Sequence, residues 1–226
     1  MREAGVHVGV RAFAAAFAMA SLAAATARAQ GDEQSCRNGL FPTSEAKIGR
    51  AQVIGKGRLV LLDDAPGCPA QTTKCRANTT SVAAGAELLT GHRLGAYVCA
   101  FDPVKDNAGY VESARLKPLP VDASPPLKAW VGAWRQYDDK IELTAKGASL
   151  VVSGEAYWPS AHAANANEGD LSGTATPKGA VVVFADSSDP DACRATLRLV
   201  GDVLVAADNQ NCGGMNVSFS GVYRRK

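Results

Sequence analysis

The amino-acid sequence predicts an all-β protein in which two small barrels follow a cleaved signal peptide. Beyond residue 30, no long stretch repeats its apolar residues at helical spacing. Turn-forming pairs instead return about every eight to twelve residues, the spacing of short strands joined by hairpins. Four prolines between Leu116 and Trp130 divide the chain into two halves of similar length.

The first 29 residues have the features of an export signal. Arg2 and Arg11 add positive charge to an alanine-rich apolar run, which ends in the small-x-small cleavage pattern Ala27-Arg28-Ala29. The run is short for a transmembrane anchor, and Arg28 closes it. We therefore expect secretory export to the bacterial periplasm, with no stable membrane anchor.

The charge of the exported part gives no support to a nucleic-acid partner. The whole chain has 24 basic and 22 acidic residues. Because the signal contains three arginines and one glutamate, the remainder has equal numbers of both signs. Proteins that bind polyanions carry basic surplus, which is missing here.

Six cysteines follow the signal, and an even number in an exported chain indicates three disulfides. The spacing places two bridges in the first half and one in the second. Cys68 and Cys75 can close a small loop across a turn, which leaves Cys36 to pair with Cys99.

The third disulfide follows from the register of a hairpin. If Gly201-Asp202 is the turn, Cys193 faces residue 210, two positions from Cys212. Gly213 and Gly214 supply the backbone freedom that such a corner needs. We therefore expect a Cys193–Cys212 bridge.

The first half, residues 30–117, contains four strand-like segments: Arg58–Leu62, Ala86–Gly91, Gly95–Phe101 and Asn107–Leu119. The segments AGAELLTGHRLGAYVCA and NAGYVESARLKPL resemble the hairpin and closing strand of bacterial SH3-like domains, over about residues 50–119. This resemblance implies a small barrel with a groove for an extended cell-wall peptide, lined by Tyr97, Phe101 and Tyr110. The alternative for Tyr97 and Tyr110 is core packing.

The proline-rich stretch, residues 118–127, is expected to be a linker, and the alternative is a loop within one domain. The second half, residues 128–226, then contains eight candidate strands: Trp130–Arg135, Lys140–Thr144, Ala148–Tyr157, Asp170–Thr176, Ala180–Ala185, Ala192–Val200, Val203–Ala207 and Met215–Arg224. Eight short strands joined mostly by hairpins predict an up-and-down antiparallel barrel.

The Trp130-x-Gly-x-Trp134 opening resembles lipocalin-like barrels and the small periplasmic metalloprotease inhibitors built on eight strands. We expect both tryptophans to pack in the barrel core. The interior is expected to be filled by apolar side chains: Val151, Ala175, Val181, Val183, Leu197, Leu199, Val203, Val217 and Phe219. A filled interior leaves the loops and rims for binding.

One pair of aromatic residues is a candidate contact site. Tyr157 and Trp158 end a long strand and lead into a polar loop that contains His162. Because consecutive strand residues face opposite ways, one of the pair should be exposed at the barrel mouth. An exposed aromatic residue there is a typical anchor for a partner.

The sequence lacks the local motifs of the common hydrolases. We interpret His92 and His162 as surface loop histidines. Asp186, Asp189 and Asp191 do not have calcium-loop spacing and are interpreted as a turn, so we expect no metal and no cofactor. The predicted function is non-catalytic binding of a cell-wall peptide or an envelope protein. The alternatives are inhibition of a periplasmic or secreted protease or lysozyme, and a hydrolase of unfamiliar type that uses paired carboxylates or a serine with His162.

Overall fold

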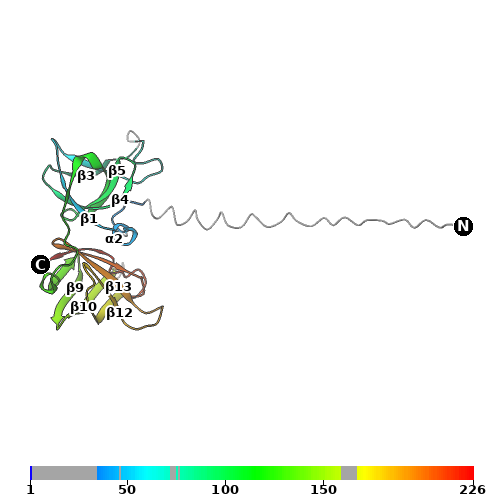
Figure 1. Cartoon of the computed structure of the whole chain (residues 1–226), viewed down its shortest axis with the longest axis vertical. Helices are drawn as coiled ribbons and strands as arrows, with labels where there is room; N and C mark the ends of the chain where they lie inside the picture. Colours follow the sequence, from blue (N-terminus) through cyan, green and yellow to red (C-terminus); the bar gives the residue numbers. More distant parts are fainter. Residues whose placement is uncertain (2–34, 46, 72–74, 76, 159–166) are drawn as a thin grey trace.

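The computed structural model describes Met1 and residues 35–45, 47–71, 75, 77–158 and 167–226. The expected signal peptide, apart from Met1, lies outside the described residues, and so does His162. The described chain is all-β and consists of two curled antiparallel sheets, which lie one above the other in Figure 1. This confirms the predicted fold class.

The first sheet has seven strands in the order β3-β2-β6-β5-β4-β1-β7. Their bounds are β1 Gly49–Val53, β2 Leu59–Leu62, β3 Ala77–Val82, β4 Glu87–Leu94, β5 Tyr97–Asp102, β6 Asn107–Glu112 and β7 Leu116–Leu119. A 3-10 turn, Ser113–Arg115, joins the last two. Neither β1 nor β3 was expected from the sequence. The prediction that His92 lies in a surface turn is wrong, because His92 lies within β4.

The second sheet has eight strands in the order β11-β10-β9-β8-β15-β14-β13-β12. Their bounds are β8 Gly132–Gln136, β9 Asp139–Lys146, β10 Ser149–Trp158, β11 Asn167–Ala175, β12 Val181–Ala185, β13 Arg194–Val200, β14 Val203–Asp208 and β15 Gly221–Arg225. The last strand pairs with the first, and the end strands β11 and β12 contact each other, so the barrel is nearly closed.

The hairpin expected at Gly201-Asp202 is present in the expected register. Val200 pairs with Val203, and Gly201 adopts the left-handed backbone, with φ of 66°, that tight hairpin turns require. The Cα atoms of Cys193 and Cys212 are 4.4 Å apart and their sulfurs are bonded. Cys36–Cys99 and Cys68–Cys75 are the other two disulfides, so the three pairs match those expected from the spacing.

The last strand begins later than the sequence predicts. The residues expected to start it, Met215 to Ser220, form a loop, and Asn216 has a φ of 67° that breaks the alternation. Val217 and Phe219 are buried as expected, but Met215 is exposed to solvent. Positive φ at one non-glycine residue is not visible in a period-two pattern.

Three strands of the barrel, β10, β12 and β14, have the opposite phase from the one predicted. Leu150 and Val152 of β10 are buried in the interior, and Val151 is not. In β12 the interior positions belong to Val182 and Phe184, and Val183 is exposed. In β14 the interior positions belong to Leu204 and Ala206, and Val203 faces the first sheet. Because side chains alternate, an error of one residue moves a whole strand to the other face. Trp130 and Trp134 are fully buried in the same core, as expected.

A second apolar cluster lies between the two sheets. It contains Phe101 and Tyr110 from the first sheet and Val203, Val205 and Val222 from the second. The short helix α2, Phe41–Ser44, inserts Phe41 among them, with its ring centroid 5.3 Å from that of Phe101. The stretch expected to be a linker begins in β7, and its Val121 packs against this shared core. The two-domain division itself stays a prediction.

Among the described residues, no helix is long and apolar enough to cross a membrane.

We predict that replacing both Cys193 and Cys212 with serine lowers the free energy of unfolding by about 3 kcal/mol, because the bridge closes a loop of roughly twenty residues. Urea denaturation monitored by far-UV circular dichroism measures the loss. A variant as stable as the wild type, or free thiols at these positions in a non-reducing peptide map, would contradict the prediction.

Candidate functional site

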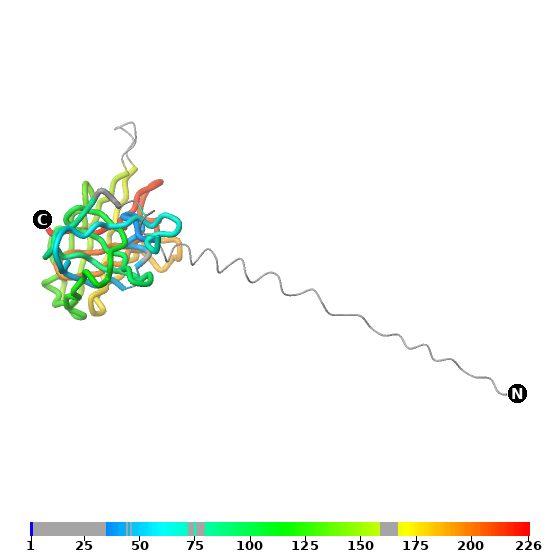
Figure 2. Tube along the Cα trace, turned by 90° about the horizontal axis from the view of Figure 1, so that it is seen from above, coloured from blue at the N-terminus to red at the C-terminus, as the bar shows by residue number. Residues whose placement is uncertain are grey.

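A cluster of exposed apolar side chains lies at one mouth of the eight-stranded barrel. We name it the aromatic surface, and it consists of Leu40 (38% exposed), Tyr137 (79%), Tyr157 (41%), Trp158 (49%) and Met215 (78%). Two adjoining grooves of about 470 and 410 Å³ run through it and share Trp158 as a wall. In Figure 2 the red loop that contains Met215 lies beside the yellow-green end of β10.

The surface combines segments that are far apart in sequence. Tyr137 is at the tip of the β8–β9 hairpin, Tyr157 and Trp158 end β10, and Leu40 precedes α2. Burial of Phe41 and the Cys36–Cys99 disulfide hold Leu40 against the barrel. The fourth segment is the loop from residue 209 to 220. The larger groove, whose lining includes Gly39, Leu40 and Thr43, therefore depends on the packing of the N-terminal segment against the barrel.

Asp208 organises the loop from residue 209 to 220. Its carboxylate accepts hydrogen bonds from the hydroxyls of Ser218 and Ser220, at 2.8 and 2.9 Å, and from the backbone N–H of Phe219 at 2.8 Å. The Cys193–Cys212 disulfide ties the other end of the loop to β13. A charged acceptor with several donors is worth more than a neutral one, so this groove wall is firmly held.

Backbone strain is concentrated at this surface. In the described part of the chain, the non-glycine residues with positive φ are Asp106, Tyr137, Gln210 and Asn216. Three of them line the larger groove, and Asp106 accepts a hydrogen bond from the hydroxyl of Tyr137. Such conformations cost free energy and gather at functional sites. The strain thus marks the aromatic surface independently of its exposed side chains.

The surface is acidic. The charged side chains described in the lining of the two grooves are Asp138 and Asp139. Burial raises the pKa of Asp139, although its carboxylate accepts a hydrogen bond from the N–H of Tyr157 at 2.9 Å. Glu155, with smaller contributions from burial, Glu168 and Asp170, raises the pKa of the Tyr157 phenol. A negative field of this kind favours a positively charged partner.

The sequence identified part of this surface. One of Tyr157 and Trp158 was expected to be exposed at the barrel mouth, and both are exposed. Tyr137, Leu40 and Met215 were not identified. The hairpin tip at Tyr137-Asp138 was a usable signal, because a large aromatic residue in a two-residue turn has no core to pack against. Leu40 reaches the surface because the N-terminal segment packs on the barrel, and Met215 because its loop bends. Neither arrangement produces a recognisable pattern in the local sequence.

The peptide groove expected in the first half does not form as expected. Phe101 and Tyr110 are buried in the shared core between the sheets, and Tyr97 packs against that core. Tyr97 and Tyr110 reach the wall of a small hollow of about 280 Å³. The physical reason is that the N-terminal segment and the barrel cover this face of the sheet. A family resemblance that covers only one half of the chain cannot predict how that half packs against the other.

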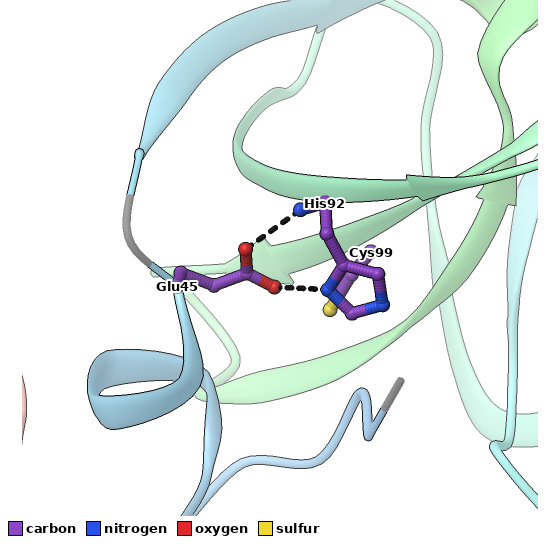
Figure 3. A group of neighbouring side chains, drawn as sticks. All are labelled: Glu45, His92 and Cys99. Atoms are coloured by element: carbon purple, nitrogen blue, oxygen red, sulfur yellow. Dashed lines mark hydrogen bonds and ion pairs between the residues drawn. The ribbon is translucent and has the colours of Figure 1, made fainter. Parts of the chain in front are cut away.

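His92 takes part in a buried polar network, shown in Figure 3. Glu45 is 2% exposed and accepts hydrogen bonds from the backbone N–H and the Nδ1 of His92, both at 2.6 Å. The Nε2 of His92 lies 2.8 Å from the hydroxyl of Tyr110. Burial, with smaller contributions from Asp64 and Glu45, raises the pKa of Tyr110 to about 12. The phenol is therefore held protonated, the opposite of an activated nucleophile.

Two groups of side chains have the composition of metal sites but not the chemistry. Glu45 and His92 lie beside the sulfur of Cys99, and Asp63 lies beside those of Cys68 and Cys75. All three cysteines are in disulfides, and the thiolate is the form that binds a metal. We therefore interpret both groups as structural.

Comparison with family models, curated proteins and solved structures found no match to this chain.

We predict that Tyr110→Phe reduces the fall in the free energy of unfolding that occurs as the pH rises above 10. The folded-state pKa near 12 lies above the unfolded value near 10, so unfolding releases protons at high pH. The Tyr110 contribution is therefore fully present below pH 10 and is lost as the pH rises toward 12, by up to about 3 kcal/mol. Urea denaturation between pH 9 and 11.5 measures the slope, which Tyr110→Phe should reduce. An unchanged slope would contradict this assignment.

Proposed function

We propose that this protein is a non-catalytic periplasmic binding protein that docks a protein partner on the aromatic surface. The observation that carries the proposal is the coincidence of exposed aromatic side chains and strained backbone around the same two grooves. The three disulfides and the signal-like first 29 residues support an exported location. The SH3-like and lipocalin-like resemblances agree with a binding role, because such barrels present their loops to ligands.

The composition of the surface favours a protein as the partner. Tyrosine, tryptophan and methionine are enriched at the cores of protein interfaces, and Tyr137, Trp158 and Met215 are the large side chains here. The grooves are open hollows beside these side chains. The carboxylates of Asp138 and Asp139 select a basic segment, whose lysine or arginine side chains also stack well on aromatic faces.

A hydrolase that this protein inhibits is the second candidate partner, because the loop from residue 209 to 220 is held in place before binding. A loop that is fixed by a disulfide and by Asp208 loses little conformational entropy when it enters a cleft. A cell-wall peptide has weaker support, since Phe101 and Tyr110, expected to bind it, are buried.

The decisive variant is Trp158→Ala, with Val183→Ala as the matched control. Val183 is 47% exposed on β12 and is absent from the lining of both grooves, so it reports the effect of losing an equally exposed apolar side chain. Partners captured from a native periplasmic extract by the oxidised protein are purified and titrated by calorimetry. We expect Trp158→Ala to raise the Kd at least about tenfold and Val183→Ala to leave it unchanged. Binding should also weaken with salt.

Three other outcomes are informative. Equal affinity of both variants for every captured partner would overturn the assignment of the aromatic surface. Cosedimentation of the wild type with purified peptidoglycan at moderate salt, unaffected by Trp158→Ala, would replace the protein partner with a cell-wall peptide. Stoichiometric loss of activity of a captured hydrolase would identify the protein as an inhibitor.

A further inference from the structure

A larger cavity, of about 580 Å³, lies between the two sheets and away from the aromatic surface. It is lined by β1, the β3–β4 turn and the end of β5 from the first sheet, and by the β13–β14 hairpin and β15 from the second. Its apolar lining includes Val82, Leu88, Leu89 and Val203, all buried. A volume of this size with a mainly apolar lining is typical of small-molecule sites.

Two cations converge at one end of this cavity. Arg58 donates through Nη2 to the backbone carbonyl of Ser81 at 2.6 Å, and Lys105 donates through Nζ to the same oxygen at 2.8 Å. Arg58 also donates through Nε to the hydroxyl of Ser81. The ion pairs of the described residues include neither of these cations. Two like charges are thus held close together around a single neutral acceptor.

Among the described residues, none of the acidic side chains in the lining forms an ion pair with Arg58 or Lys105. Glu87 forms an ion pair with Arg50. Asp102 is buried, and its Oδ1 accepts hydrogen bonds from the backbone N–H groups of Val104 and Lys105. Asp202 is in the hairpin of the other sheet. Repulsion between Arg58 and Lys105 therefore favours the arrival of an anion between them.

We propose that this cavity binds a small amphipathic carboxylate. The carboxylate lies between Arg58 and Lys105, where it makes charge-assisted hydrogen bonds to both. The apolar tail lies over Leu88, Leu89 and Val203 and is removed from water. Both ends of the ligand contribute to binding. Arg58 and Lys105 orient its carboxylate, and the apolar residues of the cavity lining provide contact area for its tail. This site is independent of the function proposed for the aromatic surface.

Decanoate is the probe, titrated by isothermal calorimetry into the oxidised protein. We expect saturable binding at one site with a Kd below 1 mM, and at least a tenfold weaker Kd for the double variant Arg58→Gln, Lys105→Gln. The matched control is Lys146→Gln, which removes an exposed cation at the end of β9 that is absent from the cavity lining. Circular dichroism melting checks that each variant folds.

Two ligand controls separate the contributions of head and tail. Decanol keeps the tail without the charge, and acetate keeps the charge without the tail, so both should bind at least tenfold more weakly than decanoate. The inference is overturned if decanoate does not saturate, if the double variant binds it as tightly as the wild type, or if decanol or acetate binds equally well. Trp158→Ala should bind decanoate normally, so a failure here and a failure of the aromatic surface are distinguishable.

Discussion

The apolar core shared by the two sheets is the constraint on which the rest of the structure depends. Strand β14 is buried on both faces: Leu204 and Ala206 point into the barrel, while Val203 and Val205 point toward the first sheet. Strand β5 is buried in the same way, with Phe101 in the shared core and Val98 in the core of its own sheet. Water is thus excluded from both sides of two strands, which fixes the sheets against each other.

Both candidate sites are consequences of this packing. Phe41 fills the shared core, so its neighbour Leu40 is brought to the mouth of the barrel. The cavity between the sheets lies beside the same core, since Leu89 and Val203 belong to both. The network of Glu45, His92 and Tyr110 closes one side of that core and satisfies the polar groups buried there. A change that separated the sheets would therefore disrupt both sites together.

The sequence predicted turns and disulfides, misplaced the inward face of several strands, and missed what depends on contact between the halves. The register at Gly201-Asp202 and the Cys193–Cys212 pair followed from turn chemistry and counting along two strands. The exposure of one of Tyr157 and Trp158 followed from their place at a strand end, and the burial of Tyr110 was the stated alternative to a groove. The burial of Phe101 did not follow, because Phe41 and the barrel strands that cover it lie more than fifty residues away. The uninterrupted apolar run Val203–Ala207 was the one available signal of a strand buried on both faces.

Charged side chains are unevenly distributed between the two candidate sites, although residues 30–226 contain equal numbers of basic and acidic residues. The carboxylates of Asp138 and Asp139 line the aromatic surface, whereas Arg58 and Lys105 converge beside the cavity between the sheets. Among the described residues of the cavity lining, Arg50 forms an ion pair with Glu87. Arg58 and Lys105 instead donate hydrogen bonds to the backbone carbonyl of Ser81. Net charge is therefore a poor guide to recognition in this chain, and the local sign of each surface selects the chemistry of its ligand.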